Sequence, residues 1–118
     1  MLLSLYLGFL LFAAMGGLLL WQPQYITRVT GQELTTIEAR NETRAVYGGF
    51  GVGAALALFI ALVWSPLRSG ICLALGLALM GMAGGRGYSA WLERPTNNII
   101  WGLLAAEAVL GFMLIFQI

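Results

Sequence analysis

The stretch EARNETRAVYGGFGVGAALALFIALVW, residues 38–64, decides the fold class of this chain. Its first seven residues carry four charges, on Glu38, Arg40, Glu42 and Arg44, and its last twenty carry none. At 1.5 Å per residue, a helix of twenty residues spans about 30 Å, which is the thickness of the hydrocarbon core of a bilayer. The stretch therefore predicts a membrane-spanning helix that is preceded by a charged segment at one membrane surface.

The composition of the whole chain also indicates a membrane protein. Of its 118 residues, 60% are hydrophobic and 9% are charged, whereas soluble domains contain about 25% charged residues. The charges come from six arginines and five glutamates, because lysine, aspartate and histidine are absent, and the net charge is +1. This charge provides no basic surface for nucleic acid. We therefore expect membrane lipids as the surroundings of the protein and no nucleic-acid partner.

Three more segments have the length of a membrane span and carry at most one charge each. The predicted spans are residues 2–21, 36–64, 71–91 and 98–118, within one domain of residues 1–118. A cleaved signal peptide is the alternative for the first of them, but no basic residue precedes it and it is longer than signal peptides require. The later connections are short, so consecutive helices run antiparallel. We predict an all-α membrane protein with four transmembrane helices in an up-down bundle.

The charged segment before the second span predicts where that helix begins. Thr35 is followed three residues later by Glu38, which is the spacing of a capping box. The second helix is therefore expected to start near Thr36 and to project from the membrane by about two turns.

The antiparallel order brings charges from two spans to a similar depth. We define side A as the membrane surface with the connections before the second span and after the third. Side B is the opposite surface, with both chain ends and the segment SPLRSG, residues 65–70. Arg86 lies about five residues from the side A end of the third span, and Glu107 lies about eight residues from that end of the fourth. Because unpaired charges are costly in lipid, we expect Arg86 and Glu107 to form a pair that faces inwards.

Further polar residues are expected close to this pair. The predicted polar cluster comprises Glu42, Arg44, Tyr47, Arg86, Ser89 and Glu107. Such groups often serve only to hold helices together in lipid. Their number in one half of the membrane also indicates a small cavity that binds a polar or anionic group. The leading hypothesis is a non-enzymatic membrane protein that binds a small ligand, a lipid head group or a partner membrane protein.

A proton-coupled transporter or exporter is the alternative function. In this hypothesis the protein acts as a homodimer, and Glu107 is the residue that takes up and releases the proton. Binding of the substrate would then compete with protonation of Glu107.

Glycines recur at helical spacing within the predicted spans. Gly49 and Gly53 are four residues apart in the second span, and Gly81 and Gly85 are four apart in the third. Small residues at this spacing allow the backbones of membrane helices to approach closely. We predict that these glycines pack against other helices of the same chain, with a homodimer contact as the alternative.

Several kinds of chemistry lack the residues they require. Without histidine, and with Cys72 as the single cysteine, the chain offers no familiar haem, zinc, copper or iron–sulfur site, so we expect no cofactor. Ser89, Tyr88 and Glu107 do not assemble into a nucleophile with a base and an orienting partner. We therefore expect no enzyme activity.

Two short motifs carry a resemblance to a known family. They are NETRAVYGG, residues 41–49, and GRGYS, residues 85–89, which is followed by Pro95. With them, residues 30–110 resemble a bacterial family of small four-helix inner-membrane proteins that is catalogued as a domain of unknown function. Arg94 departs from the glycine expected before the proline. The resemblance implies the architecture and the inner membrane as location, with no known chemistry, and a looser similarity to DoxX-like proteins extends to span count alone.

Overall fold

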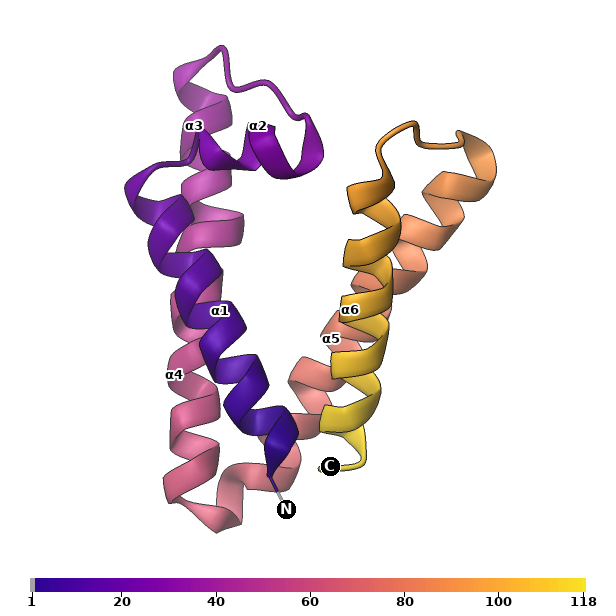
Figure 1. Ribbon diagram of the computed structural model, residues 1–118. Coiled ribbons are helices and arrows are strands. Elements are labelled where there is room, and N and C mark those ends of the chain that lie inside the picture. Colours follow the sequence, from indigo (N-terminus) through magenta and orange to yellow (C-terminus); the bar gives the residue numbers. More distant parts are fainter. Residues whose placement is uncertain (1) are drawn as a thin grey trace.

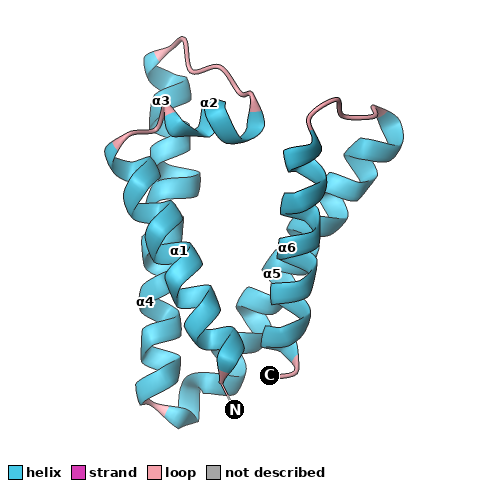
Figure 2. Ribbon diagram, in the orientation of Figure 1, coloured by secondary structure: helices cyan, strands magenta, loops and turns pink. Residues whose placement is uncertain are grey.

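The computed structural model describes residues 2–118, and almost all of them are helical. The elements are α1 (Leu3–Trp21), α2 (Tyr25–Thr30), α3 (Ile37–Thr43), the π-helix η1 (Arg44–Gly49), α4 (Phe50–Val63), α5 (Ser65–Leu92) and α6 (Asn98–Ile115). Residues 2–118 contain no strand, as Figure 2 shows. The predicted all-α class is therefore confirmed.

Four helices are long and apolar enough to cross a membrane. They are α1, the continuous helix formed by α3, η1 and α4, then α5 and α6. The second of them begins as predicted, because the Oγ1 atom of Thr36 accepts a hydrogen bond from the backbone N–H of Ala39 at 3.0 Å. The glutamate half of the predicted capping box is not used, since Thr36 rather than Thr35 is the N-cap.

The third long helix starts earlier than predicted. The segment SPLRSG was expected to be a connection, but it forms the first turns of α5. Pro66 fits there because the first turn of a helix does not need its backbone N–H groups. Arg68 donates hydrogen bonds to the carbonyl oxygens of Ala61 at 2.8 Å and Leu62 at 3.1 Å. These bonds satisfy the end of α4, so the chain reverses within a single non-helical residue.

The four long helices form two pairs, as Figure 1 shows. α1 packs along η1 and α4, and α5 packs along α6. The pairs meet at side B, where both chain ends lie and the backbone N–H of Leu3 donates to the carbonyl of Ile118 at 3.0 Å. They diverge towards side A, where the short helix α2 crosses from the first pair towards α6. The up-down order is as predicted, and the two pairs lie further apart at side A than at side B.

The hydrophobic core is concentrated at the side B end. Each long helix contributes at least one side chain that is completely buried, among them Leu5 from α1, Leu58 from α4, Cys72 from α5 and Leu114 from α6. These residues belong to one contiguous cluster. The meeting of the two pairs is therefore closed by packing at side B.

Glycines set the distance between the helices within each pair. In the first pair, a Cβ atom added to Gly51 would lie 2.7 Å from the Cα atom of Gly16. In the second pair, a Cβ added to Gly111 would lie 2.9 Å from the carbonyl oxygen of Gly76. Both distances are too short for a carbon atom, so these contacts require glycine.

The glycines predicted to make such contacts do not make them. A Cβ atom would meet nothing within 4 Å at Gly53, Gly81 or Gly85, and at Gly49 its nearest neighbour would be the carbonyl oxygen of Arg44 at 3.6 Å. The prediction of close packing within the chain is wrong at these four positions. The reason is that small residues occur on several faces of these apolar helices, so their spacing does not identify the face that meets a neighbour.

Candidate functional site

The predicted pair of Arg86 and Glu107 is present, and it joins α5 to α6. The Nε atom of Arg86 donates to Oε1 of Glu107 at 2.7 Å, and the Nη2 atom donates to Oε2 at 3.0 Å. This two-point contact matches the planar fork of the guanidinium to the carboxylate. The side chains are 20% and 11% exposed, respectively. It is the one ion pair formed within residues 2–118.

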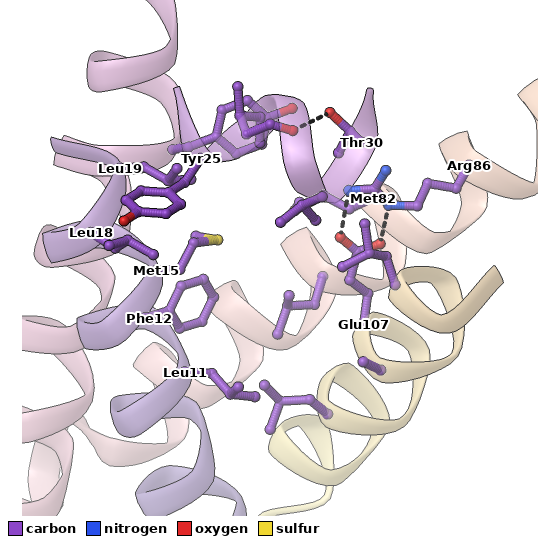
Figure 3. A pocket seen from close by; sticks show the side chains of 17 residues that line it. Leu11, Phe12, Met15, Leu18, Leu19, Tyr25, Thr30, Met82, Arg86 and Glu107 are labelled. Atoms are coloured by element: carbon purple, nitrogen blue, oxygen red, sulfur yellow. Dashed lines mark hydrogen bonds and ion pairs between the residues drawn. The ribbon is translucent and has the colours of Figure 1, made fainter. Parts of the chain in front are cut away.

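A cavity of about 340 Å³ lies beside this pair, between the two helix pairs. Its lining is almost entirely apolar: α1 contributes Leu11, Phe12, Met15, Leu18 and Leu19. α5 and α6 contribute aliphatic side chains and the Arg86–Glu107 pair. Figure 3 shows the α1 side chains on one wall and the ion pair on the other. The wall of the cavity is therefore mostly apolar and carries one ion pair, in which the charges of Arg86 and Glu107 neutralise each other.

Several residues that line the cavity are also exposed at the surface of the protein. Leu11 and Leu18 of α1 are 55% and 42% exposed, and Met82 of α5 is 37% exposed, although all three line the cavity. These residues lie within helices that are apolar enough to cross a membrane. The exposed part of the cavity lining therefore belongs to helices that can span a membrane.

Helix α2 covers the cavity at side A. It lies in the first connection, for which no helix was predicted, and it ends at Gly31 with a left-handed backbone, φ 78°. Within α2, the side chain of Ile26 is buried, and the hydroxyl of Thr30 donates to the carbonyl of Ile26 at 3.0 Å. The Nδ2 atom of Asn97, at the start of α6, donates to the carbonyl of Val29 at 3.4 Å. The cover is thus attached to both helix pairs.

Tyr47 lies in the π-helical turn η1 and lines the same cavity. Its side chain is half-buried, and its hydroxyl has no hydrogen-bond partner among residues 2–118. Single π-helical turns within α-helices are frequent at functional sites. Tyr47 was predicted as a member of the polar cluster, and the structure places it on the cavity wall, which leaves its role in binding a prediction.

A second, more polar pocket of about 380 Å³ adjoins the pair on the side towards side A. Arg86 lines both pockets, and Ser89 and Glu93 line the second one. Ser89 was predicted in the polar cluster, and it lines the second pocket together with Arg86. It does not line the apolar cavity. Arg86 therefore lies between the mostly apolar cavity and the more polar pocket and lines both of them.

Two predicted members of the cluster lie elsewhere. Glu42 is exposed and lines neither pocket. Arg44 is also exposed, and its Nε atom donates to the carbonyl oxygen of Leu20 at 3.3 Å. Because Leu20 belongs to the last turn of α1, Arg44 caps that helix instead of joining the pair. Both lie nearer the membrane surface than Arg86 does, which is why their charges do not meet it.

The apolar walls could not be recognised in the sequence. The cavity-lining residues of α1 recur at positions i, i+1, i+4, i+7 and i+8, which is the pattern of one helix face. The other faces of α1 are also apolar, so the sequence does not distinguish the face that lines the cavity.

Within residues 2–118, no three His, Cys, Asp or Glu side chains lie close enough together to hold a metal ion.

Comparisons with known proteins place the chain in a family without assigning a role. Neither the curated proteins nor the solved structures give a match. The two motifs and the DoxX-like similarity stay predictions. The family model described as "Domain of unknown function (DUF4345)" matches residues 2–117, which confirms the predicted type of family, and the chain belongs to it.

Proposed function

We propose that this protein is a non-enzymatic membrane protein that takes up a small ligand from the bilayer. The ligand has an apolar body, which occupies the cavity between the two helix pairs, and a polar end, which lies at Arg86 and Glu107. The bacterial inner membrane is part of this proposal and is supported by the family resemblance alone. The observation that carries the proposal is a bidentate ion pair on the wall of a mostly apolar cavity, which is lined by helices that can span a membrane.

The volume of the cavity limits the size of the ligand. At about 340 Å³ it lies at the lower end of the range for small-molecule pockets. An engineered cavity of about 150 Å³ holds benzene, so this one suits a body of about ten to fourteen non-hydrogen atoms. A bicyclic ring system fits that description, whereas a complete two-chain lipid does not.

The ion pair favours this function over proton-coupled export. Both carboxylate oxygens of Glu107 accept hydrogen bonds from Arg86. Protonation of Glu107 would remove the charge that strengthens these bonds and would leave the guanidinium unpaired. The proton-coupled alternative would therefore require this ion pair to break and re-form in each cycle, whereas ligand binding leaves it intact.

The direct test is retention of tetralin, a bicyclic hydrocarbon of ten carbon atoms, by the protein in nanodiscs. Equilibrium dialysis measures the tetralin held in excess of protein-free nanodiscs. Ala106 lines the cavity and its neighbour Ala105 does not, and both are exposed residues of α6. We expect Ala106→Trp to abolish the excess and Ala105→Trp to leave it within twofold of the unchanged protein. Equal retention by the two variants would contradict the proposal.

A further inference from the structure

We infer that the cavity selects ligands whose polar end is a neutral hydrogen-bond acceptor, such as a ketone or quinone oxygen, and rejects those with an anionic end. This inference rests on the proposed function, because it names the class of ligand for the same site. It narrows the expectation of a polar or anionic group, such as a lipid head group, to a neutral acceptor.

The first argument concerns the hydrogen-bond donors of Arg86. A guanidinium has N–H groups along two edges, and Glu107 occupies the edge formed by Nε and Nη2. Both N–H groups of Nη1 and one of Nη2 have no partner among residues 2–118. In Figure 3, one nitrogen of the guanidinium points away from Glu107. Because these N–H groups of Arg86 lie beside an apolar cavity, a ligand that supplies a hydrogen-bond acceptor would satisfy them.

The second argument concerns charge. Glu107 already neutralises Arg86, so the wall of the cavity carries no net charge at this spot. A second carboxylate, Glu93, lines the adjoining pocket together with Arg86. A negatively charged ligand would have to displace Glu107 or lie beside it in a medium of low dielectric constant, and both are costly. A neutral oxygen accepts from the free N–H groups without disturbing the pair.

The third argument excludes a cationic end. An ammonium group in the cavity would lie close to the guanidinium of Arg86, and Glu107 has both oxygens engaged with that guanidinium. The ammonium group would lose its water without gaining a free carboxylate. Among the groups that line the cavity, the hydroxyls of Tyr25, Thr30 and Tyr47 are the other polar ones, and they are neutral as well.

The test compares four compounds that share one bicyclic body in the same dialysis experiment. They are tetralin, its ketone 1-tetralone, the anion 5,6,7,8-tetrahydro-1-naphthoate and the cation of 1-aminotetralin. Affinities are expressed per concentration in the membrane, which the protein-free nanodiscs provide. A hydrogen bond to a charged donor predicts that 1-tetralone binds at least about tenfold more tightly than tetralin. The two ions should bind more weakly than tetralin.

A double variant assigns this preference to the pair. Arg86→Met/Glu107→Leu replaces the pair by apolar side chains of similar size, which commonly preserves folding. It should reduce the ratio of the affinity for 1-tetralone to the affinity for tetralin to less than twofold. The inference is overturned if the anion or the amine binds as tightly as the ketone, or if the double variant retains the preference. If tetralin retention does not respond to Ala106→Trp, the proposed function fails instead.

Discussion

The two ends of the same four helices are packed in different ways. At side B, fully buried side chains from all four long helices close the interface between the pairs. At side A, the pairs separate and a cavity of about 340 Å³ lies between them, with the Arg86–Glu107 pair on its wall. Apolar side chains line the space at side A and also fill the core at side B, so hydrophobicity alone does not explain the difference.

The difference follows from where close helix contacts occur. The glycine contacts join α1 to α4 at Gly16 and Gly51, and α5 to α6 at Gly76 and Gly111. Each pair is therefore a tightly packed unit. Between the pairs at side A, the contact includes the hydrogen bond from Asn97 to Val29, which is long at 3.4 Å. Each pair is thus closely packed, whereas the space between the pairs at side A is the ligand cavity that we propose.

The largest expected effect comes from a substitution that separates the two helices of one closely packed pair. Gly51→Ala places a Cβ atom 2.7 Å from the backbone of Gly16, so the helices must separate. We expect a loss of about 3 kcal/mol in the free energy of unfolding, measured by SDS titration from mixed micelles. Gly53→Ala is the matched control on the same helix, because its Cβ atom meets nothing within 4 Å. Equal losses for the two variants would refute the account of the tight pair.

A smaller effect is expected from the ion pair at the open end. Arg86→Ala and Glu107→Ala each leave one charge without its partner, and each should cost about 2–3 kcal/mol in the same titration. The double variant should cost less than the sum of the single ones, with a coupling energy of about 2 kcal/mol. Strictly additive losses would show that the two side chains do not interact in the membrane.

The smallest effect is expected from removal of the hydrogen bond between α2 and the start of α6. Asn97→Ala removes the hydrogen bond to Val29 and also the N-cap of α6, where its Oδ1 accepts from the N–H of Ile99 at 2.9 Å. The expected cost is about 1 kcal/mol, together with faster amide hydrogen exchange in α2. Asn98→Ala changes the neighbouring asparagine without touching either bond. If exchange in α2 is as slow in Asn97→Ala as in Asn98→Ala, α2 is not held by this contact.

The ion pair could be predicted from the sequence for a physical reason. Charges are rare in this chain and costly in lipid, so the few inside the spans must meet. Helical rise then gives their depths, which agree for Arg86 and Glu107. The same reasoning failed for Glu42 and Arg44 because they lie near the membrane surface, where water and helix ends provide other partners.

The cavity and the helix contacts could not be predicted. α1 is apolar on every face, so its sequence does not mark the face that lines the cavity. Gly16 and Gly51 look like Gly53 in sequence, and three-dimensional packing alone distinguishes them. The six residues of α2 are too few to give a periodic signal.

The central claim is that the two helix pairs diverge at side A to form a binding cavity beside Arg86 and Glu107. The most direct measurement is an experimental structure of the protein in nanodiscs with 1-tetralone. The account predicts density for the bicyclic body against Phe12 and Met15, with the ketone oxygen at the free edge of the Arg86 guanidinium and the ion pair intact. A structure in which Phe12 and Met15 pack directly against α5 and α6, and leave no space beside the pair, would contradict it.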